Sequence, residues 1–353
     1  MKEIYLGLKE AVRQGKTCAL ATIVKQAGPA PRGVGTQCLI MADGSIVGTV
    51  GGGLLEVRTI REAAKVFETG LPRRLSLVLK GKDVEQSDML CGGQAEVFIE
   101  PVSGPSHVPI FQEVAAIEKR GGKAVVATVL DPTMWEGDRV PKLLVRDDGQ
   151  TIGQVSDMEW LEEIVSHEMA AILDTRSPRL IPVERGQGYS LDIFLEPVAA
   201  NPVLYVFGGG HVSRQIVPLA ARVGFRVVVV DDREEFTRKE QFPDADEVHL
   251  MRFKGAVEGL PIDKDAFLVI VTRGHMHDKD VLAQALKTSA RYVGMIGSKR
   301  KRDMIYDKLL EEGFTQDDLK RVHSPIGLEI GAETPEEIAV SIVAELIKVR
   351  AGM

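Results

Sequence analysis

Residues 203–213 read VLYVFGGGHVS, an apolar run of five residues followed by three glycines and the start of a helical pattern. The apolar run has the length and composition of a strand that is buried on both faces of a parallel sheet. Gly208, Gly210 and Ser213 fit the pattern G-x-G-x-x-G/A, whose small residues permit a tight turn and let a phosphate approach the backbone. The stretch therefore predicts a strand, a phosphate-binding turn and a helix, as at the start of a Rossmann-like domain.

Strand-like and helix-like segments alternate along the chain after this motif. Continuous Val and Ile runs are typical of strands buried on both faces, so the alternation predicts a parallel sheet covered by helices. The last helix opens with Thr334-Pro335, in which Thr is a favourable N-cap and Pro suits the first helical position. The expected strands are residues 203–207, 225–230, 266–271 and 292–296, and the expected helices are residues 212–223, a segment ending at 286, 299–312 and 334–350.

Polar residues follow these predicted strands, at the edge where open parallel sheets bind ligands. Asp231 and Asp232 come about 20 residues after the glycines, where an acid would bind a ribose hydroxyl. His211 and His275 could transfer a proton or bind a metal, or each could only cap a turn. His275 and Asp278 are the candidate catalytic residues of this crevice. The predicted crevice residues are Gly208, Gly210, His211, Val212, Ser213, Asp231, Asp232, Thr272, His275, Asp278, Ser298 and Arg300.

The sequence before this domain looks internally duplicated. Residues 8–24 (LKEAVRQGKTCALATIV) and 111–130 (FQEVAAIEKRGGKAVVATVL) each read as a helix, a glycine turn and a strand, and an Asp-Gly turn follows each. Each copy ends in a similar strand, VFIEPV at 97–102 and IFLEPV at 193–198. We therefore expect two similar α+β repeats packed together.

The domain boundaries follow from these patterns. The Asn201-Pro202 pair separates two strand-like runs and is a boundary signal. The predicted fold is α/β overall, with a duplicated α+β domain over residues 1–200 and a Rossmann-like domain over residues 201–353. The repeats are expected at about 1–103 and 107–198.

Three glycine-rich loops occur in the first repeat and have no counterpart in the second. A shared fold does not require them, so they are better candidates for binding than for scaffolding. Arg32 offers a planar fork that suits a phosphate, or is only a surface Arg in a turn. Glu56 could bind a base or pterin edge, or only favour the helix dipole. Cys91 could ligate a soft metal, carry sulfur or react, or be an inert loop thiol. The predicted residues are Arg32, Gly33, Gly35, Gly51, Gly52, Gly53, Glu56, Cys91, Gly92 and Gly93.

The composition excludes several classes of protein. A net charge of −7 over 353 residues argues against a general nucleic-acid binder, which needs a basic face. Three cysteines without a C-x-x-C pair indicate a reducing compartment, and Cys18 and Cys38 lie in apolar runs that predict core thiols. No signal peptide and no membrane-length apolar run is visible, so a cytoplasmic protein without a membrane partner is expected.

These motifs together resemble the XdhC/CoxI family of accessory proteins for xanthine dehydrogenase and related molybdenum hydroxylases. The resemblance covers nearly the whole chain. The most specific string is PIGLEIGAETPEEIA at residues 325–339. The other matching stretches are residues 30–35, 48–53 with Glu56, 91–93 with Glu100-Pro101, 208–212, 230–233, Thr272 with His275 and Asp278, and 294–302.

The resemblance implies that the protein binds the molybdenum cofactor, protects it during sulfuration and delivers it to the apo-hydroxylase. The implied partners are that hydroxylase, a cysteine desulfurase and a second copy in a homodimer. Many members place a Cys directly after the glycines, where this chain has Leu54. Any sulfur or metal role would then fall to Cys91, and the identity of a bound metal is left open.

Two other functions are compatible with the residues. One is an oxidoreductase that uses NAD(P), with His275 or His211 as acid or base. The other is a nucleotidyl-transfer enzyme acting on the pterin phosphate, with Mg²⁺ at Asp231 or Asp232. The Rossmann-like domain could hold NAD(P), another nucleotide or the cofactor itself. An accessory factor without turnover is the preferred interpretation.

Overall fold

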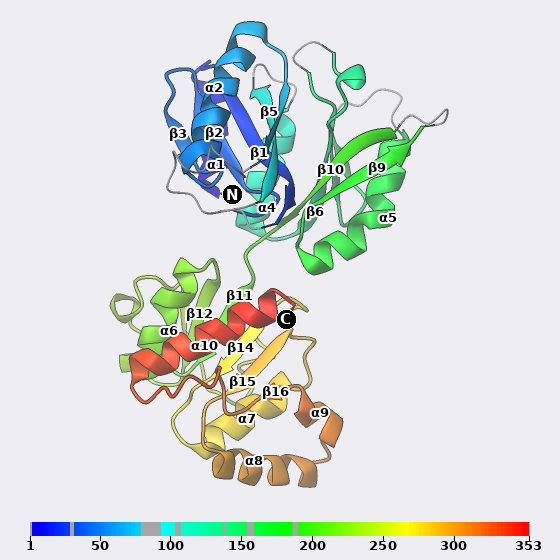
Figure 1. The fold of residues 1–353 in the computed structure, drawn as a ribbon. Helices are drawn as coiled ribbons and strands as arrows, with labels where there is room; N and C mark the ends of the chain where they lie inside the picture. The colour runs from blue at the N-terminus through cyan, green and yellow to red at the C-terminus, as the bar shows by residue number, and fades with distance from the viewer. Residues whose placement is uncertain are drawn as a thin grey trace. The chain divides into compact units, whose positions relative to one another are not determined.

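The computed structural model describes residues 2–28, 32–78, 93–102, 107–136, 139–153, 159–185 and 190–352. The chain divides into two compact units, Met1–Ala200 and Asn201–Met353 (Figure 1). Antiparallel sheets form the first unit and a parallel sheet forms the second, which confirms the predicted fold class.

The first repeat folds into an antiparallel sheet with the strand order β3-β2-β1-β5-β4. Its central strand, β1 (Cys18–Ala27), buries its first seven residues, as expected for a strand covered on both faces. The helix α2 (Gly53–Thr69) ends at Gly70, whose left-handed φ of 69° suits glycine at this position. The other elements are α1 (Lys2–Arg13), β2 (Gln37–Met41), β3 (Ile46–Gly48), β4 (Arg73–Val78) and β5 (Gln94–Val102).

The second repeat has the same topology, with the strand order β8-β7-β6-β10-β9. Its elements are α4 (Val108–Arg120), β6 (Lys123–Val129), η1 (Pro132–Met134), β7 (Lys142–Arg146), β8 (Thr151–Ile152), α5 (Glu159–Thr175), β9 (Arg179–Glu184) and β10 (Ser190–Ala199).

The pairing register of the two sheets is also equivalent. Thr22 of β1 lies opposite Gln37, and Thr128 of β6 lies opposite Lys142 in the same way. Two residues earlier on the same strands, Leu20 lies opposite Glu100 and Val126 opposite Glu196. At these positions the two repeats are equivalent, as the predicted duplication requires, and Gln37 corresponds to Lys142 and Glu100 to Glu196.

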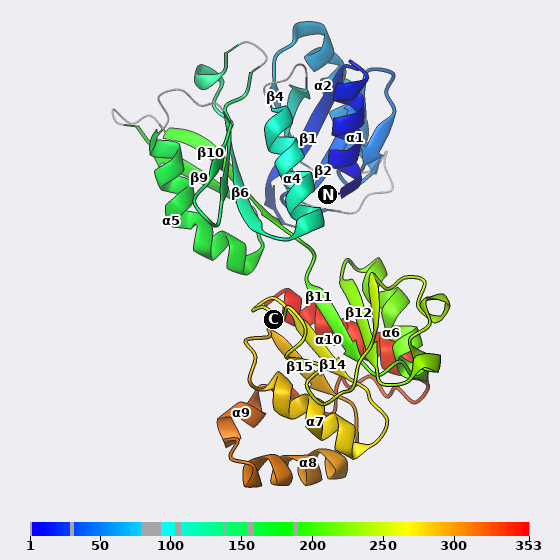
Figure 2. The same cartoon turned by 180° about the vertical axis from the view of Figure 1, so that it is seen from behind.

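The two repeats share one core. Residues of both sheets pack together with α1 and α4, which lie side by side (Figure 2). The opposite face of each sheet is covered by one helix, α2 in the first repeat and α5 in the second. Cys18 and Cys38 are fully buried, as predicted, and burial raises the pKa of their thiols to about 11 and about 12. Neither thiol is therefore a nucleophile at neutral pH.

The second unit contains a parallel sheet with the order β13-β12-β11-β14-β15-β16. This is the Rossmann strand order, and the chain reverses direction across the sheet between β11 and β14. The strands are β11 (Val203–Phe207), β12 (Arg226–Asp231), β13 (Glu247–Leu250), β14 (Phe267–Ile270), β15 (Tyr292–Met295) and β16 (Val322–His323). The two edge strands β13 and β16 escaped the sequence prediction because they are short and only partly buried.

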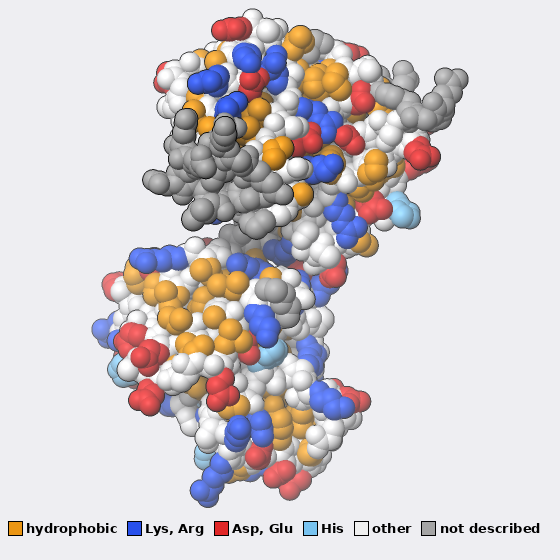
Figure 3. Space-filling model, viewed as in Figure 1, with side chains coloured by type: hydrophobic (Ala, Val, Ile, Leu, Met, Phe, Trp, Pro, Cys, Tyr) orange, Lys and Arg blue, Asp and Glu red, His pale blue; other side chains and the backbone are white. Residues whose placement is uncertain are grey.

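Helices cover both faces of this sheet. α6 (His211–Arg222) and α10 (Pro335–Arg350) pack on one face, and α7 (His275–Ala285), α8 (Lys299–Glu311) and α9 (Gln316–Lys320) pack on the other. Hydrophobic side chains gather on the outer surface over α10 (Figure 3), where Val340 and Ile347 are exposed. Short 3₁₀ turns, η2 (Glu234–Phe236) and η3 (Lys239–Gln241), connect β12 to β13.

Candidate functional site

The three glycine-rich loops of the first repeat meet the first sheet at the same end. The loop at 32–36 leads into β2 at Gln37, and β3 ends at Gly48, which lies opposite Cys38. Gly93 leads into β5 at Gln94, which lies opposite Ala27, the last residue of β1. The antiparallel register therefore places Gln37, Gly48 and Gln94, where these loops join their strands, toward the same end of the sheet.

The second glycine-rich turn has a backbone that only glycine adopts readily. Gly51, Gly52 and Gly53 have φ values of 122°, 72° and 54°, and they open α2. The Gly51 amide donates to the hydroxyl of Thr49 at 3.0 Å, and that hydroxyl donates to the Glu56 carboxylate. Glu56 thus holds the turn in shape, a structural role beside the binding role that the sequence suggested. A side chain at Gly52 would meet no atom within 4 Å, so the space above the turn is open.

The first glycine-rich loop is exposed at its beginning and packed against the second repeat at its end. Arg32 and Gly33 are exposed, as a phosphate-binding fork requires. Gly35 instead packs against the second repeat, because a Cβ atom there would lie 2.4 Å from Cγ of Pro178. Gly93 is buried at the start of β5. Cys91 and Gly92 lie outside the described residues.

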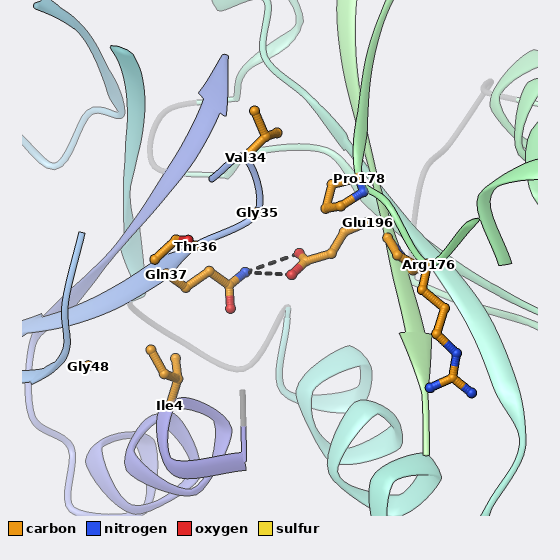
Figure 4. Close-up of a pocket in the computed structure, with 10 residues that line it drawn as sticks. Ile4, Val34, Gly35, Thr36, Gln37, Gly48, Arg176, Pro178 and Glu196 are labelled. Atoms are coloured by element: carbon orange, nitrogen blue, oxygen red, sulfur yellow. Dashed lines mark hydrogen bonds between the residues drawn. The ribbon is translucent and has the colours of Figure 1, made fainter. Parts of the chain in front are cut away.

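A cleft of about 510 Å³ lies between the two repeats, next to the first loop (Figure 4). Its polar centre is the pair Gln37 and Glu196, in which the amide Nε2 donates to both carboxylate oxygens at 3.0 Å. In Figure 4 the Arg176 guanidinium points away from this pair, and its Nη1 donates to the Ala200 carbonyl at 3.3 Å. The lining residues are Ile4, Val34, Gly35, Thr36, Gln37, Gly48, Arg176, Pro178, Glu196 and Pro197.

The glycines of the second unit have separate roles. A Cβ atom on Gly208 would lie 2.4 Å from the Val271 carbonyl oxygen, and one on Gly209 would lie 2.3 Å from the Phe236 carbonyl oxygen. Close backbone packing therefore requires glycine at both positions. Gly210, at the N-cap of α6, has an ordinary φ of −75°, and a methyl group added there would meet no atom within 4 Å. Glycine at this position leaves room for a ligand and is not needed for the fold.

Two of the predicted crevice residues are already bonded within the protein. The Ser213 hydroxyl is fully buried and donates to the Gly208 carbonyl. Asp231 is also fully buried and accepts the Gly209 amide at 2.7 Å and three N–H groups of Arg233 at 3.0 to 3.1 Å. Both of its oxygens are occupied, so Asp231 does not offer an acceptor to a ribose hydroxyl or to Mg²⁺. Burial raises the pKa of Asp231, but the bonds from Arg233 and Gly209 outweigh burial and hold it below its ordinary value.

Asp232 is a better candidate than Asp231 for a ligand contact. Its side chain is 17% exposed and pairs with Arg273 at 3.2 Å. The Arg233 guanidinium lies over the Phe236 ring at 3.7 Å, which fixes the segment after β12 above the glycine turn.

A buried ion pair ties the other strand ends together. The Asp278 carboxylate is fully buried, accepts the Thr272 amide at 3.1 Å and its hydroxyl at 2.6 Å, and pairs with the Lys301 ammonium. Lys301 also donates to the Ile296 carbonyl at 3.2 Å. Asp278 and Thr272 therefore connect β14, α7 and α8, a structural role beside the catalytic role that the sequence suggested for Asp278.

The remaining predicted residues stand at neighbouring helix starts. His211 and His275 are the first residues of α6 and α7, both exposed, after the adjacent strands β11 and β14. Val212 is half-buried in the first turn of α6. Ser298 caps α8 and Arg300 is exposed in its first turn. This edge presents free helical N–H groups with cationic side chains, a combination that suits an anion.

Sequence reasoning missed the polar residues between the repeats. Glu100 and Glu196 stand in strands that are otherwise apolar, at the same position of the duplicated VFIEPV and IFLEPV strings. A repeated charge inside a buried strand was a usable signal. Gln37, Lys142 and Lys301 carried no such signal, because their partners are distant in the sequence.

The described residues contain no group of three or more His, Cys, Asp or Glu side chains that could hold a metal ion. The helices in the described ranges all fall short of the length and apolar character that crossing a membrane requires.

Comparisons with known proteins agree along the chain. Residues 204–346 match the model described as the XdhC Rossmann domain, and residues 11–78 match the model of the XdhC and CoxI family. YqeB of Escherichia coli is 31% identical over 252 residues, which are 68% of this chain and 46% of YqeB, so the chain spans about half the length of that relative.

Other relatives match over nearly the full length. A Bacillus subtilis protein, named as a probable xanthine dehydrogenase subunit, is 25% identical over 99% of this chain and 98% of its own. The molybdenum cofactor insertion chaperone PaoD of Escherichia coli is 21% identical over 97% of this chain and 86% of its own. A crystal structure described as a xanthine dehydrogenase from Bacillus halodurans has a TM-score of 0.79 and 27% identity, covering 99% of this chain and 96% of that one. With both domains matched in order by its models, this chain belongs to the XdhC and CoxI family.

Proposed function

We propose that this protein binds the molybdenum cofactor at the glycine-rich end of the first sheet. It protects the cofactor during sulfuration and assists its insertion into a xanthine dehydrogenase-type molybdenum hydroxylase. One observation carries this proposal: the glycine-rich loops at 31–35 and 51–53 have no counterpart in the second repeat, and the register brings both to one end of the first sheet, the end at which β5 begins. The second repeat folds the same way without them, so their presence supports a binding role.

The residues present fit the phosphate group of such a cofactor. Arg32 is exposed, and a Cβ atom at Gly33 or Gly52 would meet nothing within 4 Å. Successive glycines with positive φ turn backbone N–H groups toward an anion. Arg32 would supply the guanidinium fork to the phosphate. Because Leu54 stands where many members have a thiol, the predicted sulfur-handling role rests on Cys91.

The proposed partners are an apo-hydroxylase and a cysteine desulfurase, with a homodimer as the working form in the cytoplasm. The names of two full-length relatives support the first partner, since one belongs to a probable component of xanthine dehydrogenase and the other to a molybdenum cofactor insertion chaperone. The desulfurase and the homodimer follow from the family resemblance alone.

The Rossmann domain is proposed to bind a nucleotide, either NAD(P) or the nucleotide-linked cofactor, at the open side of Gly210. The crevice between β11 and β14 is where this sheet order binds ligands. Nucleotidyl transfer through Mg²⁺ at Asp231 is disfavoured, because Arg233 and Gly209 already occupy that carboxylate.

The cofactor proposal is tested with a matched pair of variants. Arg32→Ala removes the exposed fork, and Arg139→Ala removes an exposed Arg from the corresponding connection of the second repeat. Wild type and Arg139→Ala should retain pterin, measured as the fluorescent oxidised product, and should activate the apo-hydroxylase in stoichiometric amounts. Arg32→Ala and Cys91→Ala should each retain at least about tenfold less. Equal retention by all four proteins would refute the assignment of the site.

A further inference from the structure

Two equivalent polar pairs, Lys142 with Glu100 and Gln37 with Glu196, form a polar cluster between the repeats, and the two halves of this cluster differ in one respect. In one half, Lys142 of the second repeat pairs with Glu100 of the first at 2.8 Å and donates to Thr128 at 2.8 Å. In the equivalent half, Gln37 of the first repeat reaches Glu196 of the second. The pairing thus crosses between the repeats in both halves, but a neutral amide replaces the ammonium in the second.

Among the described residues, Glu196 has the Gln37 amide where Glu100 has the Lys142 ammonium. It is 6% exposed, and among the described residues no Lys, Arg or His forms an ion pair with it. Burial raises the pKa of Glu196 to about 7, with Lys142, the N-terminal ammonium and Gln37 opposing and Glu100 raising it further. Each carboxylate oxygen accepts from the single Gln37 amide nitrogen, and an ionised carboxylate has about four acceptor positions. Acceptor capacity therefore remains.

The cleft beside Glu196 has the size and lining of a small-molecule site. Its volume of about 510 Å³ lies within the usual range of about 300 to 1,000 Å³. Ile4, Val34 and Pro178 supply apolar walls, and Gln37 and Glu196 supply the polar end (Figure 4). Such a lining suits a flat ring with a hydrogen-bonding edge.

We propose that this cleft binds a planar heterocycle whose edge presents two adjacent N–H donors to the Glu196 carboxylate. The 2-amino-4-oxopyrimidine ring of pterins and of guanine has this edge, and its two parallel bonds would resemble the fork of an Arg. The ligand's N–H groups would donate to Glu196 as the Lys142 ammonium donates to Glu100 in the other half of the cluster. The choice of pterin as the first probe rests on the proposed function. The requirement for two adjacent N–H donors rests only on the Glu196 carboxylate and the lining of the cleft.

The variant Gln37→Lys tests this proposal. By the equivalent register, its ammonium reaches Glu196 and Thr22 as Lys142 reaches Glu100 and Thr128. It should fold at least as stably as wild type and should occupy the carboxylate that the ligand needs. Gln150→Lys adds the same charge on an exposed turn of the second repeat and is the matched control.

Binding is measured by fluorescence titration of the purified full chain with pterin. Wild type and Gln150→Lys should bind pterin, and Gln37→Lys should bind it at least tenfold more weakly with an unchanged or higher melting temperature. Glu196→Gln, which is nearly isosteric, should also weaken binding at least tenfold. Lumazine, which has a 2-oxo group in place of the 2-amino group, should bind at least tenfold more weakly than pterin. Guanosine presents the same donor edge on a purine, so comparing its affinity with that of pterin shows which ring system the site prefers.

Two results would overturn the proposal: equal pterin affinity in wild type and Gln37→Lys, or equal affinity of wild type for pterin and lumazine. An undetectable affinity of wild type for both pterin and guanosine would overturn it as well. Failure of the proposed function looks different. In that case the protein would neither retain cofactor nor activate the hydroxylase, while pterin titration would still distinguish wild type from Gln37→Lys.

Discussion

The Nζ atom of Lys142 and the Oε1 atom of Glu100 form a 2.8 Å ion pair that joins the two repeats inside their shared core. Both side chains are nearly inaccessible, at 6% and 2% exposed. Lys142→Met would leave the Glu100 charge buried without a partner and should cost about 3 to 5 kcal/mol of unfolding free energy. Urea denaturation monitored by circular dichroism measures this change.

The control for that experiment is a surface pair of similar length. Lys65 and Glu62 lie 2.6 Å apart on α2, with the Lys side chain 46% exposed. Lys65→Met should change stability by less than about 1 kcal/mol, because water screens exposed pairs. Equal losses from the two substitutions would contradict a special role for the buried pair.

Glu196 should make stability depend on pH near neutrality. Its pKa is about 7 in the folded protein, against an ordinary value of 4.5, chiefly because of burial. The folded state therefore holds a proton that the unfolded state releases between these values, so ionisation destabilises the fold as pH rises from about 4.5 to about 7. At about 1.4 kcal/mol per pH unit, the shift from 4.5 to about 7 corresponds to about 3.5 kcal/mol in total.

Glu196→Gln removes this ionisation and isolates the effect. The difference in unfolding free energy between variant and wild type should shift in favour of the variant as pH rises, and should level off above about pH 7. Unfolding in urea at several pH values from 5 to 8 measures it. A constant difference across this range would show that Glu196 does not titrate there.

The substitution Gly210→Ala should weaken nucleotide binding by the second unit without much loss of stability. Its φ is −75° and an added methyl group meets no atom within 4 Å, so Gly210→Ala should change stability by no more than about 1 kcal/mol. The methyl group would nevertheless obstruct a phosphate that approaches the start of α6. We expect at least about tenfold weaker binding of AMP or NADH in calorimetric titration.

Gly209→Ala is the structural counterpart. A Cβ atom there would lie 2.3 Å from the Phe236 carbonyl oxygen, and the clash should cost about 3 kcal/mol or more. If Gly210→Ala binds these nucleotides as tightly as wild type, the glycine turn is not their phosphate site.

Asp231 should be required for stability. Asp231→Asn removes the charge that holds Arg233 and the Gly209 amide, and should cost about 3 kcal/mol. Its pKa lies below the ordinary value of 3.8, so this contribution is present above pH 3.8 and is lost as pH falls through the lower folded value.

Asp232→Asn, at the more exposed neighbour, should cost no more than about 1 kcal/mol. Thermal unfolding of both variants at pH 7 and at a pH well below 3.8 checks the order and the pH dependence. A larger loss for Asp232→Asn would reverse the assigned roles.

The sequence by itself determined the elements and their order. The apolar run at 203–207 with its glycine turn, and the duplicated strings ending in Glu-Pro-Val, predicted the Rossmann sheet and the repeated N-terminal fold, and both are confirmed. Hydrophobic period and turn chemistry act between near neighbours in the chain, so these features can be read locally.

Only the tertiary structure decided which polar side chains are free and which are already bonded. The sequence placed Asp231, Ser213 and Asp278 in the crevice, but each is buried and bonded to backbone groups, to Arg233 or to Lys301. Conversely, Gln37 and Glu196 are 159 residues apart in the sequence, and only packing of the two repeats makes them one polar end of a cleft. Desolvation and charge pairing depend on distances across the folded core, and the sequence does not carry those distances.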